Sequence, residues 1–232
     1  MIKAAIEKIL SLAEPHMIRS EDREYSDKPL TLIAPPHVSK LTFRTLRGFA
    51  DVIRSERANF SELTVVVGES FAYAFTDFAK KDRERDFPYR TEADMPFLEF
   101  GKYMPYENMM IALKSKFVPT DERDELVKLL GTITEENRTA ISDDGFTQSV
   151  NVKQGIALVG NKAVNPIVKL KPFRTFVEVD QPESEFLVRL RPGGEVALFE
   201  ADGGAWALEA RHNIAEYLRD LLSDMDNILI VE

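Results

Sequence analysis

The sequence predicts an α+β fold with a mainly antiparallel sheet and with N-terminal, central and C-terminal helices. Apolar residues recur at helical spacing in several stretches, and other stretches are β-branched or alternate between apolar and polar residues. Short turns rich in Gly, Pro and Asp join many of the expected strands directly. Hairpin links with only a few helices are typical of α+β rather than α/β proteins.

The composition is that of one sizeable folded domain. The chain has 232 residues, of which 44% are hydrophobic and 30% charged, which is enough apolar material for a buried core. We predict an N-terminal helix and linker over residues 1–29 and a single α+β domain over residues 30–232.

The N-terminal region predicts one isolated helix. Apolar residues at helical spacing cover residues 2–13, and Pro15 ends the pattern. Residues 14–29 are polar and without a period, as in a linker. We therefore expect the helix to pack loosely or on a neighbouring subunit. A short strand over residues 30–34 follows.

The next region predicts strands around one helix. Thr42 is the expected N-cap of a helix whose buried face includes Leu46, Ala50 and Ile53. Two strands, Leu63 to Val67 and Phe71 to Phe75, are expected on either side of Gly68. The mixed charges of residues 80–94 indicate an exposed loop.

Two helices and a series of strands are expected in the rest of the chain. The first helix spans the region from Tyr106 to Phe117, and the second begins after Thr120 and ends at Gly131. The expected strands cover residues 136–141, 146–152, 156–159, 167–170, 173–179, 186–190, 196–199 and 228–231. A final helix covers residues 207–221, and Asp143-Asp-Gly145 is the expected turn of the first hairpin.

Several classes of protein are excluded or disfavoured. The chain has no cysteine, which excludes disulfides, thiolate zinc sites and cysteine nucleophiles. The N-terminus does not have the pattern of a signal peptide, and no apolar run is long enough to span a membrane. We therefore expect a protein of the host-cell cytoplasm that has no membrane partner and no cofactor.

The charge distribution is uneven along the chain. Residues 178–232 hold thirteen acidic and four basic residues, whereas residues 145–177 contain no acid. The bases of that acid-free stretch, which we call the basic strip, are Lys153, Lys162, Lys169, Lys171 and Arg174.

The basic strip suggests a binding function. Lys169 and Lys171 share one face of an extended segment, opposite Val168 and Leu170, because alternate residues of a strand point the same way. These bases could contact phosphates, and Phe173 could stack on a base of single-stranded DNA or of a nucleotide. Two alternatives are a solvated edge strand and pairing with the acidic segment of another subunit in a homo-oligomer.

The acidic residues suggest an alternative, which is a metal-dependent nuclease or phosphodiesterase. Asp180, Glu200 and Asp202 would be its metal ligands. However, Glu200-Ala-Asp202 lacks the following lysine of the common restriction-like nucleases. Asp202 is also the expected cap of the helix that begins at Trp206. The chain has no P-loop and no nucleophile-elbow motif, so ATP use through a P-loop and a Ser-His-Asp triad are unsupported. A purely structural protein-interaction module is a third possibility.

The C-terminal third also carries a resemblance. The segments concerned are Pro172-Phe-Arg-Thr-Phe176, Glu178 to Ser184, Ala197 to Trp206 and Leu208 to Ala210, with Asp143-Asp-Gly145, Gln148 and Val152 to Gly155 upstream. Over residues 118–222 the chain resembles a family of phage and prophage proteins that is defined as a domain of unknown function. The resemblance implies a phage or prophage gene near recombination or replication genes. The leading hypothesis is a non-enzymatic phage protein that acts in DNA recombination, replication or counter-defence. The uneven charge and the isolated first helix indicate that it is a homo-oligomer.

Overall fold

The structure, a computed structural model, consists of two compact units, residues 1–38 and residues 39–232. The residues that it describes form five α-helices and two larger sheets in which five of the seven strand pairs are antiparallel, which confirms the α+β fold. The described residues are 2–13, 15, 17–20, 23–26, 39–77, 85–143, 157–159, 162–164, 166–191 and 193–232.

The first unit contains the expected helix and a hairpin. Helix α1 spans Ile2–Ala13. Strands β1 (Met17–Ser20) and β2 (Arg23–Ser26) pair in an antiparallel way. The hairpin corrects the prediction of an aperiodic linker, because four residues on each side are enough for a short ladder. The strand expected over residues 30–34 lies outside the described residues.

A five-stranded sheet forms the first core of the second unit. Its strands, in spatial order, are β13 (Ile228–Val231), β4 (Leu63–Val67), β5 (Phe71–Thr76), β6 (Tyr89–Glu92) and β3 (Leu41–Phe43). The β13–β4 and β6–β3 pairs are parallel, and the other two are antiparallel.

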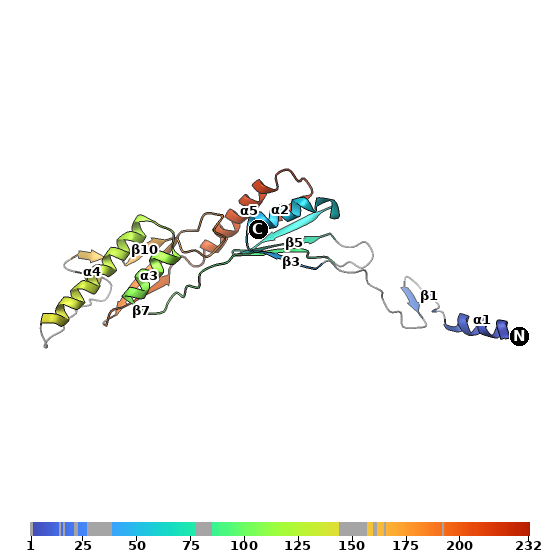
Figure 1. Ribbon diagram of the computed structural model, residues 1–232, viewed down its shortest axis with the longest axis horizontal. Coiled ribbons are helices and arrows are strands. Elements are labelled where there is room, and N and C mark those ends of the chain that lie inside the picture. The colour runs from blue at the N-terminus through green and yellow to red at the C-terminus, as the bar shows by residue number, and fades with distance from the viewer. Residues whose placement is uncertain are drawn as a thin grey trace. The chain divides into compact units, whose positions relative to one another are not determined.

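Two helices cover one face of this sheet. Helices α2 (Leu46–Ser55) and α5 (Trp206–Leu221) lie on the same side of the strands (Figure 1). A short 3₁₀ turn, η1, spans Arg57–Asn59. Ala72 and Ala74 point to the helices and are fully buried. Their small side chains let the helices approach β5 closely. Because successive residues of a strand point to opposite faces, the larger side chains of β5 lie on the other face.

Two expectations for this region were wrong. The cap of α2 is Thr45, whose Oγ1 accepts a hydrogen bond from the Gly48 N–H at 3.1 Å, because Thr42 lies within β3. Residues 80–94 do not form one loop, since Tyr89–Glu92 is a strand. Tyr89 is buried in the core, and the charged neighbours around it obscured the alternating pattern.

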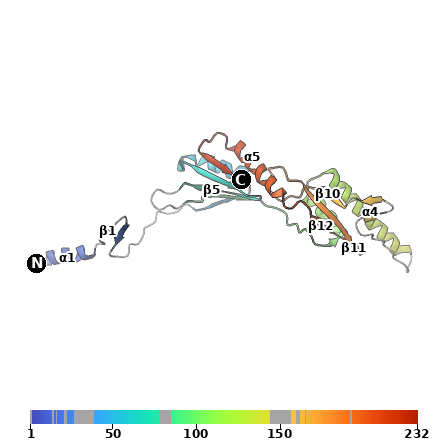
Figure 2. The same cartoon turned by 180° about the vertical axis from the view of Figure 1, so that it is seen from behind.

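A four-stranded sheet forms the second core. Its strands, in spatial order, are β10 (Ile167–Leu170), β11 (Ser184–Arg191), β12 (Glu195–Glu200) and β7 (Met104–Pro105). Helices α3 (Tyr106–Lys116) and α4 (Asp121–Asp143) pack against it, and Figure 2 shows β10, β11 and β12 beside α4. Strands β8 (Ala157–Val159) and β9 (Lys162–Val164) form a separate hairpin.

Helix α4 is longer than expected. Thr120 caps it as predicted, since its Oγ1 accepts a hydrogen bond from the Arg123 N–H at 3.2 Å. The helix continues through Gly131 and includes residues 136–141, which were expected to form a strand. A single glycine inside a helix costs only about 1 kcal/mol relative to alanine, which is too little to end it. Residues 146–152 lie outside the described residues.

The connection between β10 and β11 is a loop rather than the strand expected over residues 173–179. Within this connection, Phe176 is buried among the residues of the five-stranded core. The Glu178 carboxylate accepts hydrogen bonds from the Leu46 and Arg47 N–H groups at the start of α2, at 2.7 and 3.0 Å. A connection that begins and ends in the four-stranded sheet therefore contributes a side chain and a helix cap to the other core.

No helix among the described residues combines the length and the apolar character that a membrane crossing requires.

Candidate functional site

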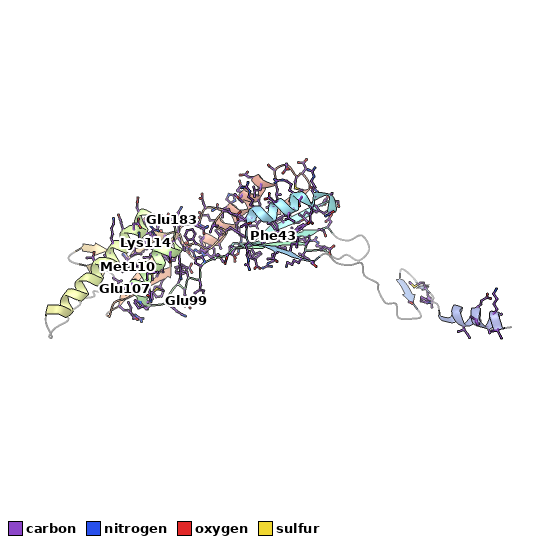
Figure 3. The ribbon with its side chains drawn as sticks, in the orientation of Figure 1. Phe43, Glu99, Glu107, Met110, Lys114 and Glu183 are labelled. Atoms are coloured by element: carbon purple, nitrogen blue, oxygen red, sulfur yellow. The ribbon has the colours of Figure 1, made fainter. Side chains whose placement is uncertain are left out.

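The basic strip does not form one uniform surface. Lys153 lies outside the described residues, and of Lys162 only the position within β9 is described. Lys169 is exposed on β10, as expected, with its Nζ 3.7 Å from Glu183 Oε1. Figure 3 marks Glu183. Glu122 Oε2 accepts a hydrogen bond from the Lys169 backbone N–H at 2.5 Å. One carboxylate of the same chain thus lies near the Lys169 ammonium, and a second one binds its backbone.

The last two positions of the basic strip and Phe173 follow β10. Lys171 and Phe173 are half-buried, and their backbones bond to the end of α3: the Val118 N–H donates to the Lys171 carbonyl at 2.8 Å, and the Phe173 N–H donates to the Lys116 carbonyl at 2.9 Å. Phe173 therefore starts the loop beside α3 and does not continue a flat strand face.

Arg174 is buried and paired within the chain. Its side chain is only 10% exposed, and its Nη1 forms an ion pair with Glu200. Its Nη2 donates a hydrogen bond to Ser184 Oγ, and its guanidinium carbon lies 4.3 Å from the centre of the Trp206 ring. Burial lowers the pKa of Arg174, while the charges of Glu200 and Asp202 oppose that shift. The guanidinium thus serves the chain's own carboxylates.

Two of the three proposed metal ligands belong to this same cluster. Asp202 Oδ2 accepts a hydrogen bond from Ser184 Oγ at 2.6 Å, and Asp202 Oδ1 accepts one from the Gly204 N–H at 3.1 Å. Gly204 has a φ of 84°, so the turn before α5 needs a glycine there. Asp202 therefore bonds an amide of the turn that precedes α5, whereas the N-cap of the helix is Ala205, which has no side-chain cap hydrogen bond.

The third proposed ligand, Asp180, is exposed, and its backbone carbonyl accepts a hydrogen bond from Asn213 Nδ2 at 3.0 Å. Within the described parts of the chain, no group of three or more His, Asp or Glu side chains is placed to hold a metal ion.

Gln181 organises the loop that carries Arg174. Its Oε1 accepts hydrogen bonds from the Arg174 and Thr175 N–H groups at 3.1 and 3.3 Å, and its Nε2 donates to the Phe176 carbonyl at 2.8 Å. The buried amide thus replaces the strand partners that this segment lacks.

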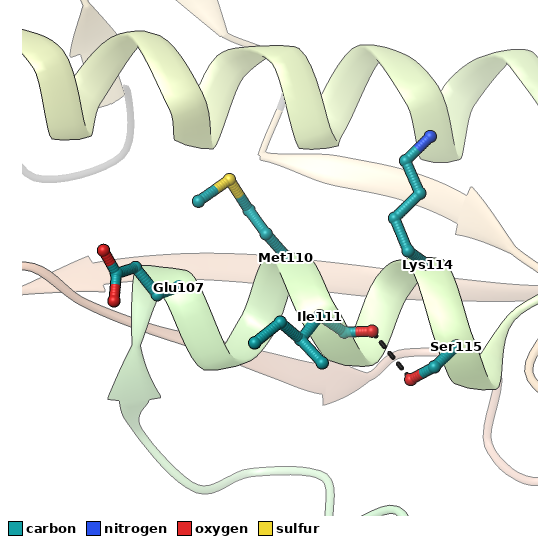
Figure 4. A pocket seen from close by; sticks show the side chains of 5 residues that line it. All are labelled: Glu107, Met110, Ile111, Lys114 and Ser115. Atoms are coloured by element: carbon teal, nitrogen blue, oxygen red, sulfur yellow. Dashed lines mark hydrogen bonds between the residues drawn. The ribbon is translucent and has the colours of Figure 1, made fainter.

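A shallow hollow of about 580 Å³ lies along α3 (Figure 4). Met110 and Lys114 point toward α4, and the lining otherwise consists of Glu107, Ile111 and Ser115. The Ser115 hydroxyl bonds back to the Ile111 carbonyl at 2.7 Å. Because the lining is mostly apolar and comes from one helix, it lacks the convergent polar groups of a catalytic pocket.

The face of the five-stranded sheet opposite α2 and α5 carries a row of aromatic rings. We call Phe71, Tyr73, Phe75 and Phe87 the aromatic row. The rings of Phe71 and Tyr73 are nearly parallel, at 13° with 6.2 Å between centres, and those of Tyr73 and Phe75 are 6.4 Å apart. Phe87 packs 5.6 Å from Phe75 and is itself exposed.

Arginines accompany the aromatic row. The Arg85 guanidinium lies 4.4 Å from the centre of the Phe75 ring, and that of Arg90 lies 5.4 Å from the Phe71 ring. Glu92 Oε1 lies 2.6 Å from Arg90 Nε, and Glu92 Oε2 lies 3.8 Å from Arg44 Nη1. Arg90 and Arg44 thus share the Glu92 carboxylate, and Asp86 follows Arg85 in the sequence, so this face carries charges of both signs.

Register explains why these groups meet. Tyr73 lies between Val66 of β4 and Arg90 of β6, and Phe71 lies opposite Glu92. Sequence reasoning predicted the strand Phe71 to Phe75 but missed the site. The available signal was the alternation of aromatic rings with alanines, because the alanines mark the helix-covered side.

Fold and surface together define an α+β protein in which a helix-backed sheet presents aromatic and arginine side chains on its other face. Comparisons of the chain with family models, with curated proteins and with solved structures found no match.

Proposed function

We propose that this is a non-catalytic protein of phage or prophage origin that binds single-stranded DNA, works as a homo-oligomer, and serves recombination, replication or counter-defence. The aromatic row is its ligand surface. The proposed phage or prophage origin rests on the resemblance over residues 118–222. The binding function rests on one observation, which is the half-exposed row of rings accompanied by arginines on one sheet face.

The chemistry of this face favours an unpaired strand. Base–aromatic stacking contributes about 1–3 kcal/mol per base, and every base has a planar face that can stack. A duplex hides those faces within its own stack, so only a single strand offers them. Phe71, Tyr73 and Phe75 are alternate residues of one strand, which gives successive bases successive platforms. The Arg85 and Arg90 guanidinium groups lie over these rings, but Arg90 is paired with Glu92, so we expect most of the affinity to come from stacking on the rings.

The basic strip supports the proposal less well. Lys169 lies near Glu183, and Arg174 is paired with Glu200. A lysine or arginine side chain that is already paired with a carboxylate displaces few counterions from a nucleic acid, so it adds little affinity. The ligand class expected from the sequence is therefore kept, but its site moves from β10 to β5 and β6.

The test is the affinity for a fluorescently labelled oligothymidine, measured by anisotropy at low and moderate salt. Wild-type protein should bind with salt-sensitive affinity. Tyr73→Leu and Phe75→Leu keep apolar bulk but remove a ring, and each should weaken binding about 5-fold to 100-fold, since each removes one stacking platform.

The matched control is Tyr103→Leu. Tyr103 contacts Arg191 and Phe199 of the four-stranded sheet, so its loss should change the affinity by less than about twofold. The double variant Lys169→Glu with Lys171→Glu should also bind nearly as well as wild type. Equal losses in Tyr73→Leu and Tyr103→Leu, or a large loss only in the lysine variant, would overturn the assignment to the aromatic row.

The same samples, incubated with Mg²⁺ or Mn²⁺, test the alternatives. The oligonucleotide should stay intact on a denaturing gel. Cleavage that disappears in Asp202→Asn would instead support the nuclease. The absence of both binding and cleavage would leave the protein-interaction module and end the proposal.

A further inference from the structure

The two larger sheets have four edge strands among the described residues, and three of these strands carry features that discourage pairing with another chain. The two sheets end in β13 and β3 and in β10 and β7. Strand β7 has only two residues and contains Pro105, β10 carries the exposed Lys169, and β3 has three residues followed by the exposed Arg44. Short length, proline and charge are the usual protections of an edge.

Strand β13 is the least protected of the four, although it has only four residues, because the charge that follows it, Glu232, is already paired with Arg219. Its sequence is Ile-Leu-Ile-Val, without charge, proline or glycine. Leu229 and Val231 are 61% and 40% exposed, whereas Ile228 and Ile230 pack against the core. An apolar edge strand of this kind is a template for pairing with another strand.

The register of β13 shows which backbone groups are offered. The strand runs parallel to β4, and the Leu63 N–H donates to the Asn227 carbonyl at 3.0 Å. Because successive residues of a strand direct their backbone groups to opposite sides, Leu229 and Val231 bond toward β4. The N–H and C=O groups of Ile228 and Ile230 therefore point away from the sheet.

We propose that β13 pairs with β13 of a second copy, antiparallel, about a twofold axis through Ile230. In that register Ile230 exchanges hydrogen bonds with its counterpart, and Ile228 does so with the partner's Glu232. Leu229 faces the partner's Val231 in a non-hydrogen-bonded pair, where side chains are closest. The two exposed apolar side chains of each copy thus bury one another.

Charge and symmetry favour this register. Glu232 already binds Arg219 Nη2 at 2.8 Å, so its charge is balanced before it meets the partner's Ile228. A twofold interface places one surface against itself, and twofold dimers are the most common soluble oligomers. The pairing would join two five-stranded sheets into one, with helices on one face and both aromatic rows on the other. It does not depend on what the aromatic row binds.

Because the chain contains no cysteine, introduced cysteines give an unambiguous cross-linking test on the full-length protein. The variant Leu229→Cys with Val231→Cys should form a covalent dimer under mild oxidation, seen on a non-reducing gel. The control is Thr42→Cys with Arg44→Cys, which places two alternate cysteines in and directly after β3, the strand at the opposite edge of the same sheet. This variant should stay monomeric on the same gel.

Mass measurement by light scattering completes the test. Wild type should have at least twice the chain mass of 26.4 kDa, and Leu229→Lys with Val231→Lys should lower that mass by bringing four lysines together. Because both side chains are exposed, the substitution should leave the circular dichroism spectrum unchanged. A wild-type monomer at tens of micromolar would overturn the proposal. So would a larger species that the lysine variant leaves intact and the cysteine pair does not cross-link.

Discussion

The two larger sheets share one plan and differ in what they leave on their second face. Each packs two helices against one side, α2 and α5 in one case and α3 and α4 in the other. The five-stranded sheet then exposes aromatic rings beside arginines. On its second face the four-stranded sheet has only the single ring pair Tyr103–Phe199 among its described residues, and it carries opposite charges in register, with Lys169 opposite Glu185 and Arg191 opposite Glu195.

This difference shows that a charge pattern in the sequence does not indicate a binding site until the partners of each charged side chain are known. Exposed ion pairs contribute about 0–1 kcal/mol and attract an external ligand weakly, because each charge already has its counterion in the chain. Half-exposed aromatic rings have no such partner in water, and a contiguous patch of them usually marks a binding surface. The comparison therefore supports the proposal that the rings of the five-stranded sheet bind a ligand, whereas the charges of the four-stranded sheet are paired within the chain.

The largest stability effect should follow the removal of Arg174. Arg174→Met keeps the length of the side chain but leaves Glu200 and Asp202 without their cation. We expect a loss of about 2–3 kcal/mol in the free energy of unfolding, less than for a fully buried pair because Glu200 is partly hydrated. Urea titration followed by circular dichroism measures it.

The control for that change is Arg189→Met, an exposed arginine on β11, which should cost less than about 0.5 kcal/mol. Oligonucleotide affinity should stay within about twofold in both variants, since neither touches the aromatic row. If Arg174→Met abolished oligonucleotide binding but had the same urea midpoint of unfolding as wild type, the division between the two sheets would be wrong.

A smaller effect should follow the loss of the helix cap that links the two cores. Glu178→Ala removes the acceptor of two N–H groups at the start of α2 and should cost about 1 kcal/mol in the free energy of unfolding. Thermal unfolding compares it with Glu183→Ala, whose partner Lys169 is exposed and which should cost less than about 0.5 kcal/mol. Equal losses would show that the cap contributes nothing particular.

The smallest expected effect is a pH dependence at Asp202. Desolvation alone would raise the pKa of this carboxyl, but hydrogen bonds from Ser184 and Gly204 and the charge of Arg174 outweigh it and lower the pKa below 3.8. The stability that the ionised group adds is therefore complete above its unfolded-state pKa and is lost as the pH falls through the lower folded-state value.

Asp202→Asn should accordingly be less stable than wild type at pH 7 by less than about 1 kcal/mol, with the gap closing as the pH falls below the ordinary pKa of an aspartate. Denaturant titrations at several pH values measure the gap, and Asp180→Asn serves as the control for removing an acid. A gap that widens on acidification would contradict the assigned hydrogen bonds.

Local patterns predicted most elements because their signals were local. The strand Leu63 to Val67, the Thr120 cap and the helix before Leu221 each depend on neighbours in sequence, and the structure has all three. The strand Tyr89–Glu92 was missed because its alternation is carried by Tyr89 and Thr91 among charges. The segment from Phe173 to Val179 looked like a strand, but Gln181 holds it as a loop.

The candidate site depended on long-range information that one sequence does not contain. Arg174 and Asp202 were assigned to rival hypotheses, and Ser184 joins them in one cluster. The aromatic row needed the sheet register, because only the pairing of β5 with β6 places Arg90 beside Tyr73. Alternation indicated that two faces exist, but it did not say which one the helices cover.

The position of Trp206 gives the molecule an internal optical reporter. It is the only tryptophan of the chain, and its indole lies against the Arg174 guanidinium, away from the tyrosine of the aromatic row. Its emission should therefore follow the ion-pair cluster and the loop that enters the other core. Loosening of that junction can thus be followed spectroscopically without a label.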